Sequence, residues 1–169
     1  MKKTILLTIA LAFAAATGFA QKFGYCNTTQ ILTLIPEVKA ADSDLKAFQT
    51  QLNKRGQDMV KTLQDKDTEL QRKKEQGTIS PNDYQTQATK LQEEQEKISK
   101  YEQEVMAQMA QKREELYKPI FDRFNKAMND VAKENGFSLV FDTNAQVLLY
   151  ADESLDVTKQ VKAKLGINN

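Results

Sequence analysis

The chain has 169 residues with 24 basic residues, 23 acidic residues and no histidine. This balance argues against a nucleic-acid partner, because a phosphate-binding surface needs a clear basic excess. Without histidine, neither a hydrolytic triad nor a His-containing metal site can form. The six glycines are scattered and form no phosphate loop. We therefore expect no enzyme and no catalytic, cofactor-binding or metal-ligating residues.

Residues 1–20 have the pattern of a secretory signal peptide. Lys2 and Lys3 precede an apolar run over 4–16, and small residues at 18 and 20 predict cleavage after Ala20. The alternative is a membrane anchor, but the run is shorter than the ~20 apolar residues that a span needs. Cleavage would leave 22 of the 24 basic residues against 23 acidic ones, so we expect a nearly neutral exported protein.

The exported part begins with a short strand over 22–26, followed by a helix over about 28–34. Asn27 to Gln30 form a capping box at the start of that helix, which we favour over the glycosylation triplet that Asn27 also begins. Cys26 is the one cysteine of the chain, so no intrachain disulfide can form. We expect it to be a buried small apolar residue, and a disulfide between subunits is the alternative.

Two long helices joined by a tight reversal follow. Pro36 opens the first helix, Gly77 ends it, and Ser80 and Pro81 start the second, with Ile79 exposed at the tip. Apolar residues at a 3-4 spacing predict a coiled-coil seam between the helices, with a register shift near Arg55. The seam residues are Val38, Ala41, Leu45, Phe48 and Leu52, then Met59, Leu63 and Leu70, and on the return Tyr84, Ala88, Leu91, Gln95, Ile98, Glu102, Val105 and Met109.

The second helix meets Pro119, where we expect a kink and the joint between hairpin and body. Asn135-Gly136 then ends the helix. Two strands are predicted over 137–141 and 146–151, with a turn between them. A last helix over about 156–165 carries Val157, Val161 and Leu165 on one face.

These elements predict a mostly helical α+β fold. Each long helix has roughly 40 residues and a length of about 60 Å, so the antiparallel hairpin projects as an arm from a small β body. Three short strands are too few to stand alone, and we expect subunits to join them into a shared body. The domain bounds are a signal peptide at 1–20, the first part of the body at 21–36, the arm at 37–118 with its tip near 77–80, and the second part of the body at 119–169.

This order of elements resembles the Skp/OmpH family of periplasmic chaperones. The residues that carry the resemblance are Phe23 to Asn27 leading into Ile31 to Pro36, and the region from Pro119 to Leu165, with Ala132 to Phe137, Leu139 to Asp142 and Leu155 to Thr158. The resemblance implies a periplasmic homotrimer whose β-barrel body carries three helical arms. It further implies that unfolded outer-membrane proteins are held in the cavity between the arms, without ATP, for outer-membrane assembly. The near-neutral charge departs from strongly basic family members, so lipopolysaccharide binding is doubtful.

We expect the trimer body to use the apolar strand residues Phe23, Tyr25, Phe137, Leu139, Phe141, Val147 and Leu149. Clients would meet scattered apolar side chains of the arm, and the candidates are Leu70, Ile79, Tyr84, Tyr101 and Met106, the last two lying just beside the seam. Met59, Leu63 and Met109 are better explained as helix-packing residues. The alternatives are a coiled-coil spacer or scaffold of the cell envelope, and a non-catalytic subunit of an envelope enzyme. A spacer would favour a more continuous heptad pattern than the one seen after Leu52.

Overall fold

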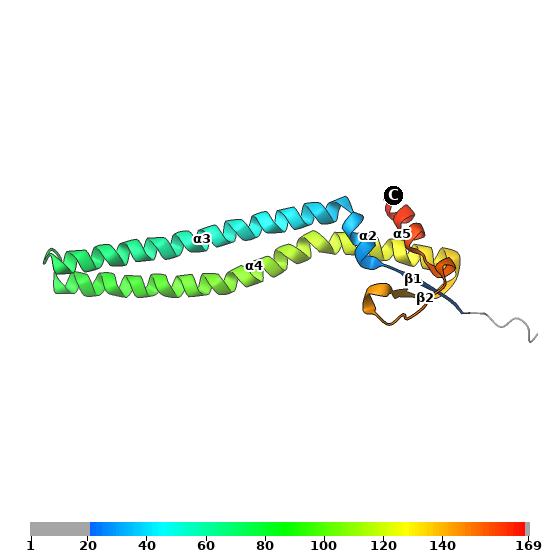
Figure 1. Cartoon of the computed structure of the whole chain (residues 1–169). Helices are drawn as coiled ribbons and strands as arrows, with labels where there is room; N and C mark the ends of the chain where they lie inside the picture. Colours follow the sequence, from blue (N-terminus) through cyan, green and yellow to red (C-terminus); the bar gives the residue numbers. More distant parts are fainter. Residues whose placement is uncertain (1–20, 168–169) are drawn as a thin grey trace, which may run out of the picture. The chain divides into compact units, whose positions relative to one another are not determined.

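The computed structural model describes residues 21–167, and the predicted signal peptide at 1–20 lies outside them. The chain forms two compact units (Figure 1). One unit contains 21–34 and 123–167, and we call it the body; the other contains 35–122, and we call it the hairpin. Over the described residues, none of the helices combines the length and the apolar character needed to cross a membrane.

The body is built on two parallel strands, β1 (Lys22–Cys26) and β2 (Phe137–Asp142). Phe23 pairs with Leu139 and Tyr25 with Phe141, after an irregularity between Lys22 and Phe23. Parallel strands need a long connection between them. Here the connection is the short helix α2 (Thr28–Leu34) together with the whole hairpin. The strand at 22–26 and the helix at 28–34 are confirmed as predicted.

The core of the body lies on one face of this sheet. Gly24 and Cys26 of β1 point into it, while Phe23 is 40% exposed on the opposite face. A side chain at Gly24 would come within 3.1 Å of the Phe137 ring and 3.2 Å of Val157, so this position must stay small. The fully enclosed part of the core consists of Cys26, Ile31, Phe124, Val131, Val157 and Val161.

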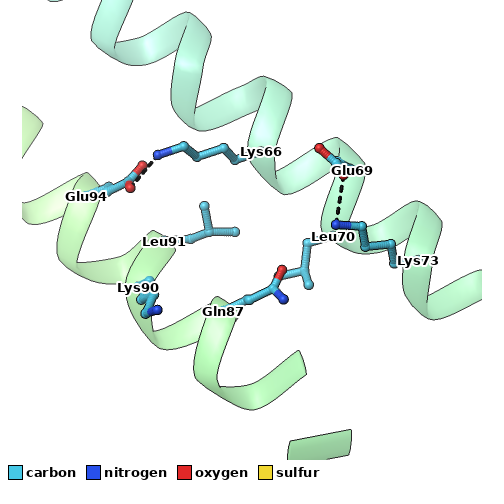
Figure 2. A pocket seen from close by; sticks show the side chains of 8 residues that line it. All are labelled: Lys66, Glu69, Leu70, Lys73, Gln87, Lys90, Leu91 and Glu94. Atoms are coloured by element: carbon cyan, nitrogen blue, oxygen red, sulfur yellow. Dashed lines mark hydrogen bonds and ion pairs between the residues drawn. The ribbon is translucent and has the colours of Figure 1, made fainter. Parts of the chain in front are cut away.

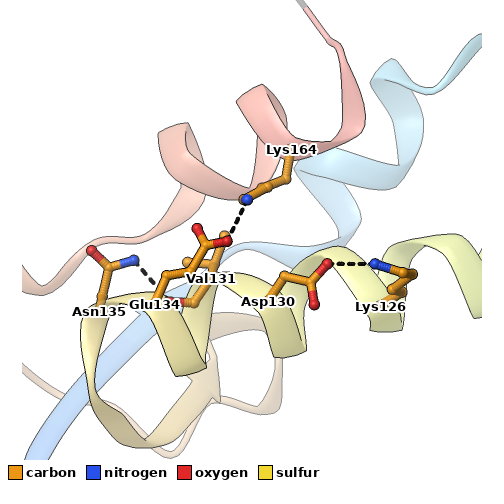
Figure 3. Close-up of polar contacts among 6 residues, drawn as sticks. All are labelled: Lys126, Asp130, Val131, Glu134, Asn135 and Lys164. Atoms are coloured by element: carbon orange, nitrogen blue, oxygen red, sulfur yellow. Dashed lines mark hydrogen bonds and ion pairs between the residues drawn. The ribbon is translucent and has the colours of Figure 1, made fainter.

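The C-terminal helix α5 (Thr158–Leu165) completes the body. Val157 and Val161 are buried and Leu165 packs against the core, which confirms the predicted apolar face. Figure 3 shows Lys164 of α5 bonded to Glu134 of α4, with 2.6 Å between Nζ and Oε1. The helix begins two residues later than expected because Asp156 accepts a hydrogen bond from the Thr158 amide at 2.8 Å and stays in extended backbone.

The predicted strand over 146–151 is wrong. Instead, β2 is followed by a 3-10 turn, η1 (Thr143–Ala145), and Gln146 adopts the left-handed conformation with φ 54°. A second 3-10 turn, η2 (Glu153–Leu155), comes before α5. The alternating apolar pattern is present, but among the described residues this segment pairs with no strand. Val147 is consequently 63% exposed and Leu149 fully exposed.

Asp142 ties three elements of the body together. Its carboxylate accepts hydrogen bonds from the Thr28 hydroxyl, the Thr28 amide at the start of α2, and the Asn144 amide in η1. Burial disfavours the charged carboxylate, but these hydrogen bonds outweigh it and hold the pKa of Asp142 below its ordinary value. The end of β2 is thereby fixed to the start of α2.

The hairpin consists of α3 (Pro36–Glu75) and the part of α4 (Pro81–Asn135) up to residue 122, which run side by side (Figure 1). The cap of α3 is a Schellman motif: Gly77, at φ 65°, donates to the Lys74 carbonyl, and the Thr78 amide donates to the Lys73 carbonyl. Ser80 caps α4 by accepting from the Asp83 amide at 3.1 Å. The predicted reversal is confirmed.

Near its root, the hairpin is joined by a polar contact. The Tyr117 hydroxyl donates to Asp42, and its ring stacks on Phe121 with 6.0 Å between centroids. The hydrogen bond to Asp42, with burial, raises the pKa of Tyr117. The helix α4 continues through Pro119 to Asn135, so a kink at Pro119 stays a prediction. The domain bounds at 36/37 and 118/119 also stay a prediction.

Candidate binding surfaces of the helical hairpin

The seam between the helices differs from the predicted one at its centre. On α4, Gln95 and Glu102 are exposed, and the neighbouring Glu94 and Tyr101 turn toward α3 instead. On α3, Gly56 takes the seam position after Leu52. Two steps of four residues, from Phe48 through Leu52 to Gly56, follow each other here. This is the register shift that the sequence indicated, and it leaves space between the two helices at this point.

Tyr101 fills that room, so the expectation that it lies beside the seam is wrong. It is 6% exposed, and its hydroxyl donates to the Leu52 carbonyl at 3.0 Å. Gly56 lies opposite the ring, and a Cβ atom at this position would be in ordinary van der Waals contact with it, at 3.5 Å. The Arg55 guanidinium covers the ring at 5.2 Å from its centroid. The signal that could have located Tyr101 in the seam is the mid-helix glycine opposite it.

The other predicted contact residues fall into three positions. Leu70 is 3% exposed between the helices, so like Tyr101 it offers little surface to another molecule in this structure. Ile79 is half-buried rather than exposed, and Tyr84 is half-buried under the Lys74 ammonium, 4.5 Å from the ring centroid. Met106 is 77% exposed. The role of all five residues in binding stays a prediction.

One flank of the hairpin, which we call the amide face, carries uncharged polar side chains beside apolar ones. Its central groove encloses about 510 Å³, with Leu52, Gly56 and Tyr101 among the residues that line it. A second groove of about 350 Å³ shares Gln64 with it and leads toward the tip. The amides of this face are Asn53, Gln57, Gln64 and Gln71 on α3 and Gln92 and Gln95 on α4, and its apolar residues are Val60, Ile98, Val105 and Met106.

The opposite flank, which we call the charged face, has a different chemistry. Figure 2 shows Lys66 of α3 bonded to Glu94 of α4 at 2.6 Å and Glu69 bonded to Lys73 at 2.8 Å, around Leu70 and Leu91. These ion pairs occupy the rim of a groove of about 210 Å³. The charged face consists of Arg55, Asp58, Lys66, Glu69 and Lys73 on α3 and Lys90, Glu94 and Lys97 on α4.

The body carries an apolar surface of its own. Phe23 and Phe141 lie together on the outer face of the sheet, 6.4 Å between ring centroids, beside Leu139, which is 54% exposed. Phe137 differs from the expectation, because it packs against the core beneath the Lys22 ammonium. Among the described strands, β2 pairs with β1 alone. The use of these residues in a trimer stays a prediction.

Cys26 is enclosed in the body, as expected. It is 1% exposed and free, and burial, followed by the charges of Asp142 and Asp156, raises the pKa of its thiol to about 11. A thiol with a raised pKa remains protonated and unreactive near neutral pH. Between residues 21 and 167, no three His, Cys, Asp or Glu side chains come together as a group that could hold a metal ion.

These features define a helical-hairpin protein with a small α/β body and two chemically distinct surfaces along the hairpin. The chain belongs to the OmpH-like family, since the family model described as outer membrane protein (OmpH-like) matches residues 22–165. It is 30% identical over 172 residues to the chaperone protein Skp of Yersinia enterocolitica, covering 96% of this chain and 100% of that protein.

Two further comparisons cover most of the chain. An uncharacterized protein of Aquifex aeolicus is 26% identical over 168 residues, covering 98% of this chain and 96% of the relative. A crystal structure from Caulobacter crescentus, described as an outer membrane chaperone (OmpH-like), superposes with a TM-score of 0.71 at 20% identity. It covers 86% of this chain and 83% of the solved one, and it confirms the mostly helical α+β fold.

Proposed function

We propose that this protein is a periplasmic holdase chaperone. It binds unfolded outer-membrane proteins without ATP or any chemical reaction, and keeps them soluble until they are assembled. Its relationship to the Skp chaperone supports the class of function. The observation in the structure that carries the proposal is the amide face, where an apolar groove lies open beside amides. Such a surface suits a holdase, because it can bind apolar side chains and exposed peptide groups together.

The composition of the groove favours weak binding of many clients over tight binding of one. Met106 is exposed on its rim, and a methionine side chain adapts to differently shaped apolar partners. The interruption of the seam at Leu52 and Gly56 also counts against a simple spacer, which needs a continuous heptad pattern. On the charged face, the ion pairs Lys66–Glu94 and Glu69–Lys73 lie at the rim of one groove, which therefore offers less to an apolar client.

We further propose that the protein works as a homotrimer joined through its body. The outer face of the sheet leaves Phe23, Leu139 and Phe141 partly exposed, and the segment over 146–151 leaves Leu149 bare. An unpaired strand edge beside apolar side chains is a typical site for pairing with another chain. Pairing of the 146–151 segment with a second copy would give it the partner it lacks. Analytical ultracentrifugation that finds a stable monomer would rule out this assembly.

The test of the function is the aggregation of a client. A urea-unfolded outer-membrane β-barrel protein is diluted into buffer with or without this protein, and light scattering is recorded. We expect suppression at a small molar excess of trimer, in the absence of ATP. A soluble protein such as serum albumin at the same mass concentration serves as the control. Scattering equal to that of the control would contradict the chaperone proposal.

A further inference from the structure

We propose that the amide face selects one kind of segment: an extended, uncharged stretch of chain in which every second side chain is apolar. This inference rests on the proposed chaperone function and names the part of a client that the hairpin binds. It follows from three properties of the central groove: its floor, the spacing of its amides and its charge. Each of them can be traced to particular residues of α3 and α4.

The lining of the groove is apolar at its base, where Gly56 carries no side chain. Leu52 and Tyr101 lie at the bottom and are nearly buried, so the apolar surface that a partner can reach is mainly that of Val60 and Met106. Val60 is 39% exposed and Met106 is 77% exposed on the two sides of the groove. A volume of about 510 Å³ is far more than one side chain needs, so the groove can hold several apolar side chains from one segment.

Two amides of α3, Asn53 and Gln57, lie one helical turn or about 6 Å apart, close to the two-residue repeat of an extended chain, and Gln64 lies about 10 Å further along. Asn53, Gln57 and Gln64 face the same groove, and their side-chain amides make no hydrogen bond to any described residue. From position 53 to 64 a helix rises by about 16 Å, the length of about five residues of extended chain. Such a chain places alternate side chains on one face and its peptide groups at the edge. Three apolar side chains of the client segment can then enter the groove, while the side-chain amides of the hairpin hydrogen-bond to the backbone of the segment.

The charge of the groove suits an uncharged occupant. Lys61 and Glu102 are the charged residues among those that line it, and they have opposite signs. Lys61 is already bonded to Asp65 at 2.6 Å. The charged face instead presents Lys66, Lys73 and Lys90 with two acidic residues around its groove. A neutral segment therefore suits the amide face, because the segment carries no charge that would lose its water without gaining a partner.

The test uses two fluorescein-labelled peptides of identical composition, each about nine residues long. One has Leu and Tyr at alternate positions with Thr and Ser between them, and the other has the same residues at a three-four spacing. Binding to the full protein is measured by fluorescence anisotropy. We expect the alternating peptide to bind about tenfold more tightly, because it alone can place three consecutive apolar side chains of one face in the groove. Equal affinities would overturn the inference.

Matched variants locate the site and separate the two interactions. Val60→Glu puts a carboxylate on the amide face and is expected to lower the affinity for the alternating peptide about tenfold. Thr62 lines a groove of the charged face together with Arg55 and Lys97. Thr62→Glu makes the same charge change there and should leave binding within about twofold. Gln57→Leu removes an amide but keeps the groove apolar, and we expect about threefold weaker binding. Circular dichroism confirms that each variant is folded.

The results distinguish this inference from the function on which it rests. If Val60→Glu and Thr62→Glu weaken binding equally, or if Gln57→Leu strengthens it, the proposed recognition is wrong. Suppression of client aggregation by the same preparation would then show that the chaperone function stands without it. A preparation that neither suppresses aggregation nor distinguishes the peptides contradicts both proposals.

Discussion

The two flanks of the hairpin share the same helices and the same seam but differ in how their polar groups are used. On the charged face, Lys66 and Glu94 join the two helices, and Glu69 and Lys73 neutralise each other. On the amide face, the side-chain amides of Asn53 and Gln57 make no hydrogen bond within the part of the chain that the structure describes. The first flank therefore holds four of its charged side chains in ion pairs, and the second keeps these two amides available for a partner.

The seam residue Tyr101 supports both flanks, and its loss should have the largest effect. Tyr101→Ala removes a buried ring and its hydrogen bond to the Leu52 carbonyl. We expect the free energy of unfolding of the hairpin to fall by about 3–5 kcal/mol. Urea unfolding followed by circular dichroism measures it. Tyr150→Ala, at a residue that is 85% exposed, is the control and should change little. A loss below about 1 kcal/mol would contradict the burial of Tyr101.

Gly56 offers a way to separate stability from binding. In Gly56→Ala the added methyl group would meet the Tyr101 ring at 3.5 Å, an ordinary van der Waals contact. Alanine favours a helix interior over glycine by about 1 kcal/mol, so the hairpin should become more stable. The same methyl group makes the floor of the amide-face groove shallower, and client holding should weaken. Urea unfolding and the aggregation assay check the two effects, and stronger holding would contradict the importance of the groove.

The ion pair between Lys66 and Glu94 should contribute little to stability, although it joins the helices. The two side chains are 50% and 32% exposed, and water screens such pairs. We expect Lys66→Met to lower the free energy of unfolding by less than about 1 kcal/mol. Client holding should not change, because the amide face is untouched. A large loss of holding in the aggregation assay would show that the charged face takes part.

Salt should have the smallest effect on holding. Added sodium chloride weakens interactions between exposed charges, and at about 1 M the screening length is roughly 3 Å. Binding through the amide face uses apolar contacts and neutral hydrogen bonds, so the suppression of aggregation should persist at that concentration. The control is the client alone at each salt concentration. A steep decline of suppression with salt would show that clients bind mainly to the charged face.

The sequence was sufficient for the elements whose signals are local. The capping residue Asn27, the reversal at Gly77 and Ser80, and the helix end at Gly136 all follow from residue types with definite backbone or capping preferences. The inner face of α5 could be predicted because its apolar spacing is regular. Such features depend on a few adjacent residues and are independent of the rest of the chain.

The features that depend on a distant partner could not be predicted. The segment over 146–151 has the alternation of a strand, but alternation does not show whether another strand is within reach. Tyr101 and Leu70 were candidates for contact with clients, and both are buried because of the register between two long helices. The amide face was missed for the same reason, since its residues come from both helices and no apolar stripe marks it.

The most direct test of client binding through the amide face is site-specific photocrosslinking to a client. Benzoylphenylalanine replaces Met106 on the amide face or Lys97 on the charged face, and each variant is illuminated with a urea-unfolded outer-membrane protein after dilution. We expect strong crosslinking from position 106 and little from position 97, with equal suppression of aggregation by both variants as the control for function. Crosslinking from position 97 that equals or exceeds that from position 106 would contradict binding through the amide face.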